Sequence, residues 1–177
     1  MKKTDRNITD VQADSLKDQL LKARHNIGLD KLKIDNYYES VKEIDQKLFI
    51  NDCNAIDMNA CMATIDQQVG NVIWICYAPP LERDLISLKS LVKNKVKALF
   101  CLGENTEHFF NVFSEDVEFF IKIDSIEEGL VTANKYGSKG DTVLFSPGSP
   151  NYRFFESDLD WNKEFDDAIE EINKTSK

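Results

Sequence analysis

Short apolar runs alternate along the chain with longer segments in which apolar residues recur every three or four positions. Runs such as Val72–Tyr77 and Thr142–Phe145 have the length of one strand and are largely apolar, which is typical of strands covered on both faces. The strands predicted are 37–44, 47–51, 72–77, 98–102, 117–123 and 142–145, and the helices are 57–68, 84–94, 106–113, 125–136 and 159–173. This order predicts an α/β fold, a three-layer sandwich around a mostly parallel sheet of about six strands.

Two local signals refine this picture. The first two strands flank Asp45-Gln46 closely enough to form a hairpin, which gives the sheet one antiparallel edge strand. Ser125-Ile126-Glu127-Glu128 has the form of a capping box, in which the Ser125 hydroxyl and the Glu128 carboxylate satisfy free amides at a helix start. We expect that helix to end before Gly137.

Residues 1–32 differ in pattern from the rest. Within 10–24, Val11, Leu16 and Leu20 recur at helical spacing, and Gly28 is well placed to end a helix. We interpret this segment as an amphipathic N-terminal helix that packs on the main domain, with docking on a partner as the alternative. The predicted division is therefore a helical extension, 1–32, and one α/β domain, 33–177.

Composition excludes several classes of function. The 177 residues carry a formal net charge of −9, which disfavours nucleic acid and anionic membranes as partners because both require clustered Lys and Arg. No apolar run is long enough to span a bilayer, and no apolar region follows the first lysines as in a signal peptide. We therefore expect a cytoplasmic protein.

The cysteines and histidines do not form a metal-binding pattern. No CxxC spacing occurs, and the residues concerned are Cys53, Cys61, Cys76, Cys101, His25 and His108. We expect no zinc site and no cofactor, four reduced and mostly buried thiols, and a packing role for His108.

The stretch from Gly140 to Phe155 combines a strand with a loop rich in proline, Ser-Pro-Gly-Ser-Pro, and then resumes as a helix. A parallel strand that ends in such a loop opens toward the crevice at the carboxyl edge of the sheet. Five segments of the chain resemble the Mur ligases. They are GDTVLFSP in this stretch, EIDQKLFINDCNA (43–55), NVIWI (71–75), VKALFCLGENTE (96–107) and SIEEGLVTA (125–133). The resemblance covers roughly 37–172 and is nearest to the D-glutamate-adding members.

The resemblance implies a Rossmann-like C-terminal domain, the part that brings the incoming amino acid to the ligase. It also implies separate domains for ATP and for the UDP-linked substrate. The sequence contains no G-x-x-x-x-G-K-[ST] motif to hold the phosphates of ATP. Alone, the chain is therefore not expected to be an amide ligase, and we assign no catalytic residue.

The residues that the resemblance places near ligands are only partly retained. Asp52 is kept, whereas the family's lysine and threonine in the same run are Asn54 and Ile56 here. A second lysine position holds Leu81, and Arg83 is a weak substitute. In the last loop Ser146, Pro147 and Phe155 are kept, Asn151 replaces a serine, and Trp161-Asn162 replaces an arginine-glycine pair. The candidate ligand-binding residues are Asp52, Asn54, Ser146, Asn151 and Phe155.

The sequence gives less support to other kinds of function. Ser146 or Ser149 as a nucleophile would need a base, and no histidine lies near the crevice in sequence. Tyr152, Phe154 and Trp161 are candidates for an aromatic interaction surface, because exposed aromatics anchor many interfaces. We expect a protein partner or a weakly bound small ligand, either glutamate or a nucleotide.

Three functions stay open at this point. The first is a non-catalytic binding or scaffolding module derived from a Mur ligase. The second is an accessory domain in peptidoglycan precursor synthesis that binds D-glutamate or nucleotide, or completes a split ligase. The third is a structural protein that self-associates through its N-terminal helix and a sheet edge. An open polar cleft at Asn54, Leu81 and Asn151 would favour a ligand, whereas a cleft filled by Ile56, Leu81 and Tyr77 would exclude one.

Overall fold

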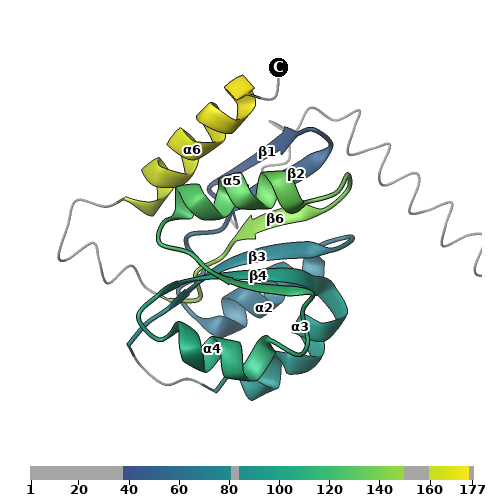
Figure 1. Ribbon diagram of the computed structural model, residues 1–177, viewed down its shortest axis with the longest axis vertical. Coiled ribbons are helices and arrows are strands. Elements are labelled where there is room, and N and C mark those ends of the chain that lie inside the picture. The colour runs from purple at the N-terminus through teal and green to yellow at the C-terminus, as the bar shows by residue number, and fades with distance from the viewer. Residues whose placement is uncertain (1–37, 81–83, 150–159, 176–177) are drawn as a thin grey trace, which may run out of the picture. The chain divides into compact units, whose positions relative to one another are not determined.

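The computed structural model describes residues 38–80, 84–149 and 160–175. They form a six-stranded sheet in the order β1-β2-β6-β3-β4-β5 with helices on both faces (Figure 1). The strands are β1 (Ser40–Ile44), β2 (Lys47–Asn51), β3 (Val72–Ala78), β4 (Val96–Gly103), β5 (Phe119–Lys122) and β6 (Thr142–Phe145). The helices are α2 (Met58–Gln67), η2 (Ile86–Leu88), α3 (Lys89–Lys95), α4 (Thr106–Phe113), α5 (Ile126–Tyr136) and α6 (Trp161–Thr175).

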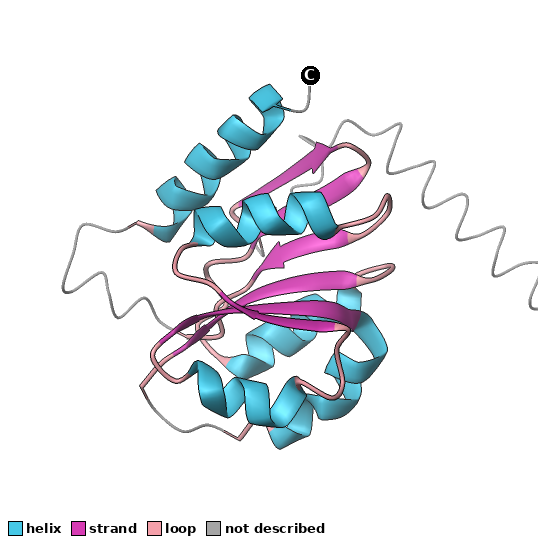
Figure 2. Cartoon of the chain, viewed as in Figure 1, coloured by secondary structure: helices cyan, strands magenta, loops and turns pink. Residues whose placement is uncertain are grey.

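The predicted three-layer α/β class is confirmed. β1 pairs antiparallel with β2, and the other neighbouring strands pair in parallel. Helices α5 and α6 cover one face and α2, α3 and α4 the other, as the helices on either side of the strands in Figure 2 show. Every residue of β3 is buried because both of its faces lie under helices, which is why its sequence is a continuous apolar run.

The hairpin and the helix caps agree closely with the sequence pattern. Asp45 and Gln46 have φ angles of 50° and 62°, the left-handed conformation that two-residue hairpin turns require. The Ser125 hydroxyl accepts from the Glu128 N–H at 3.0 Å. The Glu128 carboxylate, however, accepts from the Asp124 N–H at 2.8 Å, one residue earlier than a capping box places it. The helix still ends at Tyr136, before Gly137.

One predicted helix is divided in the structure. Instead of a single helix over 84–94, a 3₁₀ turn, η2, precedes the shorter α3. The Asp84 carboxylate accepts from the Ile86 N–H at 3.0 Å, which fixes a turn at the start. Leu85 and Leu88 are both buried, and a 3₁₀ turn aligns residues three apart more closely than an α-helix does.

The strand order creates the place where a ligand would be expected. β6 lies between β2 and β3, so loops from distant parts of the sequence meet at the carboxyl edge of the sheet. The loop after β6 is buried over 146–149. The predicted N-terminal helix and the last part of this loop lie outside the described residues, so the division at residue 32 stays a prediction.

Candidate functional site at the carboxyl edge of the sheet

Two of the candidate residues meet where β2 and β6 end. Asp52 follows β2, Ser146 follows β6, and the two strands are parallel neighbours. The Ser146 hydroxyl donates to the Asp52 carboxylate at 2.9 Å, and the Asp52 N–H donates to the carbonyl of Phe145 at 2.8 Å. Asp52 and Ser146 are thus in direct contact, and their role in ligand binding stays a prediction.

These residues are sealed inside the domain. Ser146 is fully buried and Asp52 is 4% exposed. The Ser146 carbonyl accepts from the indole N–H of Trp74 at 2.8 Å and from the Cys61 thiol at 3.3 Å. The Cys61 sulfur also lies 2.9 Å from the Ser146 hydroxyl oxygen. Their polar groups therefore bind one another, and this cluster fastens the last loop to the start of α2.

The environment changes the acid-base properties of the site. Burial raises the pKa of the Asp52 carboxyl to about 6, although hydrogen bonds with Thr64 and Ser146 act in the opposite direction. Burial, and then the negative charges of Glu39, Asp52 and Asp160, raise the pKa of the Cys53 thiol to about 12. Cys53 stays a neutral thiol at neutral pH and is unsuited to act as a nucleophile.

Asn54 and Ile56 point away from this cluster. Asn54 is exposed and its side-chain amide donates to the Glu39 carboxylate. The side chain of Ile56 is 56% exposed, so it does not pack in the interior. Together with Asp57, Met58 and Asp84, Ile56 lines an open cavity of about 420 Å³ between the start of α2 and η2. Ile56 does not fill the crevice.

The structure also corrects the interpretation of Trp161. This residue is only 5% exposed, with its ring 5.5 Å from that of Tyr77 and 5.6 Å from that of Phe145. It begins α6 and packs in the core beneath that helix, so it cannot contribute to an exposed aromatic surface. Tyr77 is buried in the same core cluster. The other candidates, Asn151, Tyr152, Phe154 and Phe155, lie outside the described residues, as does Leu81.

Sequence reasoning missed the amide pair that closes the site toward α6. The Asn51 side-chain amide donates to the side-chain oxygen of Asn162 at 2.8 Å, and the Cys53 thiol lies 3.0 Å from the same oxygen. Asn162 stands in the position that the resemblance assigns to glycine of an arginine-glycine pair. The replacement of that glycine by a polar residue was the signal in the sequence that could have indicated this hydrogen bond.

The charge at this edge is negative. In the described residues, the loops that follow the five parallel strands contain no lysine or arginine. They carry exposed carboxylates instead, which belong to Asp57, Asp84, Glu104 and Asp124. Lysines occupy the amino ends of the strands, where they are paired: Lys97 with Asp141 at 3.1 Å, and Lys47 with the Asn134 carbonyl at 2.6 Å. Within the described part of these loops, phosphate and carboxylate ligands find no cation, although Lys122, the last residue of β5, is exposed at the carboxyl end of its strand.

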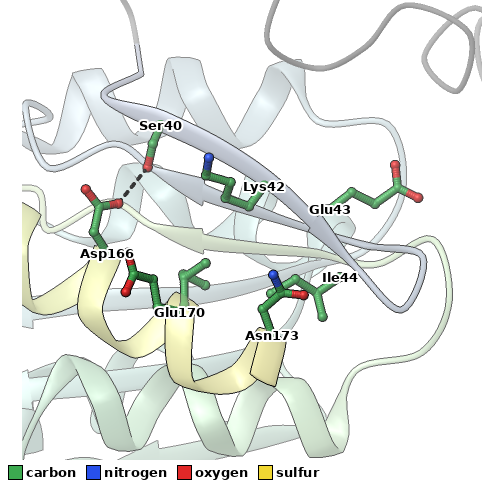
Figure 3. A pocket seen from close by; sticks show the side chains of 8 residues that line it. Ser40, Lys42, Glu43, Ile44, Asp166, Glu170 and Asn173 are labelled. Atoms are coloured by element: carbon green, nitrogen blue, oxygen red, sulfur yellow. Dashed lines mark hydrogen bonds between the residues drawn. The ribbon is translucent and has the colours of Figure 1, made fainter. Parts of the chain in front are cut away.

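A second cavity, of about 350 Å³, lies between β1 and α6. Figure 3 shows its side chains coming from these two elements, with the Ser40 hydroxyl donating to Asp166 at 3.2 Å. Lys42 faces it together with the acidic residues Glu43, Asp166 and Glu170. One of its lining residues, Ser40, pairs with Asn51 just before Asp52, but none of the candidate ligand-binding residues lines this cavity.

Two further searches cover the described part of the chain only. Within it, no group of three or more His, Cys, Asp or Glu side chains is placed to hold a metal ion. None of its helices has the length and apolarity needed to cross a membrane. All four cysteines lie in this part, and none of them forms a disulfide.

No family model matches the chain. It is 28% identical over 170 residues to the UDP-N-acetylmuramoylalanine–D-glutamate ligase of Christiangramia forsetii, which covers 94% of this chain and 38% of that protein. It is 33% identical over 124 residues to the ligase of the same name from Chlorobium phaeobacteroides, which covers 70% of this chain and 26% of the relative. The chain therefore spans well under half the length of these curated relatives.

Several solved structures are similar to the chain. One is a domain assigned to a UDP-N-acetylmuramate:L-alanyl-gamma-D-glutamyl-meso-diaminopimelate ligase of Haemophilus ducreyi, with a TM-score of 0.47 and 14% identity. The match covers 78% of this chain and 98% of that one. MurF ligase from Thermotoga maritima has a TM-score of 0.43 and 17% identity, covering 72% of this chain and 31% of that one. The sequence relation extends over nearly the whole chain, and the fold is the α/β sandwich that the resemblance implies. The chain is therefore a Mur-ligase-related domain, homologous to part of the UDP-N-acetylmuramoylalanine–D-glutamate ligases.

Proposed function

We propose that this chain is a non-catalytic binding module derived from the amino-acid-binding domain of a Mur ligase. The observation that carries the proposal is the chemistry of the carboxyl edge. Its retained polar residues, Asp52 and Ser146, bind each other in the interior, and the exposed charges in the described part of its loops are carboxylates. ATP and glutamate are anions, and such charges repel both.

The exposed part of the edge suits a different kind of ligand. Ile56 and Met58 offer apolar surface in the cavity at the start of α2, and Asp57 and Asp84 flank it with negative charge. A protein segment that carries both basic and apolar side chains is complementary to this combination. The module would then hold a protein partner rather than turn over a substrate.

The proposal is tested by thermal unfolding of the chain with D-glutamate, ADP or ATP at millimolar concentration. A ligand present at about a hundred times its Kd stabilises the folded state by roughly 2.7 kcal/mol, which raises the Tm by several degrees. We expect no rise for the natural sequence. A concentration-dependent rise with any of the three would refute a module that has lost these ligands.

A matched variant shows whether the assay could have detected binding. Asn54→Lys with Ile56→Thr restores the cation and the hydroxyl of the family pattern at two exposed positions. Since both side chains are at the surface, the substitutions are expected to change stability by less than about 0.5 kcal/mol. We expect this variant to gain stabilisation by ADP or D-glutamate that the natural sequence lacks.

A second candidate is an accessory role in peptidoglycan precursor synthesis, in which the chain completes a D-glutamate ligase supplied by another protein. It is favoured by the homology to these ligases over 94% of the chain. The test adds the chain to a D-glutamate ligase truncated to remove the homologous region and measures phosphate release that depends on D-glutamate. Restored release supports this role, and unchanged release removes it.

A further inference from the structure

The edge of the sheet formed by β5 is unusually apolar for an exposed strand. Phe119 of β5 and Phe110 of α4 are each 48% exposed. The Phe110 ring stacks edge-on against Phe120 at 5.3 Å, and the Phe119 ring lies 4.7 Å from that of Tyr136 on the other face. Edge strands of soluble proteins are normally protected by charge, proline or a bulge, and this one presents aromatic rings on both faces.

The backbone of β5 is available for pairing. In the described residues, β5 pairs with β4 on one side and with no strand on the other. Two carbonyls of β4, those of Lys97 and Cys101, accept from the Glu118 and Ile123 N–H groups at 2.9 and 3.1 Å. Because Leu99 and Cys101 stand beside Phe120 and Lys122 in this parallel pair, Phe119 and Ile121 bond to β4, and the N–H and C=O groups of Phe120 and Lys122 are directed toward the open edge.

We propose that a second copy of this chain pairs with the first through β5, antiparallel, with the two-fold axis at Phe120. This register aligns Glu118 of each copy with Lys122 of the other, and Phe119 with Ile121. The two Phe120 residues exchange their outward hydrogen bonds at the axis, where their rings also meet. The two six-stranded sheets become continuous, and the Phe119 and Phe120 rings of both copies lose their exposure to solvent.

The charges at the two ends of β5 favour this register and favour a second copy of the chain as the partner. The five residues Glu118–Lys122 carry opposite charges at their two ends, so the segment is complementary to an inverted copy of itself. A shift of the axis to Ile121 would place Glu118 opposite Asp124, a pair of like charges. Glu118 accepts a hydrogen bond from the Tyr136 hydroxyl at 3.0 Å, and Lys122 is exposed. The inference does not use the loops at the carboxyl edge and is independent of the proposed function.

Sedimentation velocity of the full chain over a range of concentrations tests the interface. We expect a reversible monomer–dimer equilibrium. Glu118→Lys and Lys122→Glu each replace two attractive pairs by two repulsive ones, so each should weaken dimerisation roughly ten-fold. The double variant Glu118→Lys/Lys122→Glu restores complementarity and should regain most of the affinity.

A backbone variant tests the hydrogen bonds separately. Phe120→Pro removes an N–H that is directed outward, and edge positions of this kind tolerate proline. Phe120→Thr is the matched control, since it loses the same ring but keeps the N–H. We expect the proline variant to be monomeric and the threonine variant to dimerise more weakly than the natural chain, both with native circular dichroism. A natural chain that stays monomeric at roughly 0.5 mM, or a dimer unaffected by the single charge reversals, would overturn the proposal.

Discussion

The carboxyl group of Asp52 lies buried between the end of β2 and the loop that follows β6. Its pKa rises from an ordinary value of 3.8 to about 6 because burial disfavours the charged form. Between these two pH values the folded chain keeps a proton that the unfolded chain releases. The contribution of Asp52 to stability is therefore complete below about pH 4 and is lost as the pH rises through about 6, an effect of roughly 3 kcal/mol.

Asp52→Asn tests this assignment, because asparagine keeps the size of the side chain and an acceptor for the Ser146 hydroxyl. At pH 4 we expect the variant and the natural chain to have similar free energies of unfolding. At pH 7.5 the variant should be more stable by up to about 3 kcal/mol, since it has no charge to bury. Urea unfolding at a series of pH values measures the difference, and two parallel stability profiles would show that Asp52 is not the titrating group.

The resemblance to the Mur ligases placed Asp52 and Ser146 among the candidate residues, and they meet because β2 and β6 are parallel neighbours, an order that the sequence pattern did not predict. The sequence was not sufficient to show that they are sealed, since the seal depends on Cys61 and Trp74 from other elements. The exposure of Ile56 could not be predicted for a related reason. It depends on how the chain enters α2, which the apolar character of the residue does not reveal.

At the scale of elements, the loop after β6 packs directly on α2. Gly148 has a φ of +65°, and a Cβ atom there would lie 2.0 Å from the Met58 methyl carbon and 3.0 Å from the Cys61 sulfur. The left-handed backbone favours glycine at this position, and the Met58 side chain fills the space that a Cβ atom would need.

A double-mutant cycle tests this contact between loop and helix. Gly148→Ala alone should reduce the free energy of unfolding by about 2 kcal/mol, through overpacking and the left-handed backbone. In a Met58→Ala background the same change should cost about 1 kcal/mol less, because the methyl group then has room. Guanidinium unfolding of the four proteins provides the coupling. Equal costs in both backgrounds would exclude Met58 as the reason for Gly148.

Helix α6 shows how an element was predicted correctly and one of its residues was not. The helix was expected over 159–173 and runs from Trp161 to Thr175. Trp161 was assigned to an interaction surface because it follows a loop rich in aromatics. The buried positions of α6 are Trp161, Phe165, Ala168, Ile169 and Ile172, an i, i+4, i+7, i+8 and i+11 series that places Trp161 on the apolar face. Helical periodicity was the better guide than nearness to the loop.

For the whole molecule, the proposed function separates architecture from chemistry. The mostly parallel six-stranded sheet with helices on both faces is the α/β fold that the resemblance to Mur ligases implies, and hydrophobic pattern largely determines it. The charge at the carboxyl edge depends instead on single exposed residues, such as Asp57, Asp84 and Glu104, which the fold does not constrain. A scaffold can therefore persist while its affinity for anionic substrates is lost.

Titration of the isotope-labelled chain, followed by backbone amide NMR, tests this loss most directly. D-Glutamate and ATP are added separately, and the amides of residues 52–57, 103–105 and 146–149 are observed. We predict that their shifts do not move in a saturable way at millimolar ligand, whereas the Asn54→Lys/Ile56→Thr variant shows saturable shifts in the same loops. Saturable shifts confined to these loops in the natural chain would contradict the account, because the edge would then still bind the substrates of its relatives.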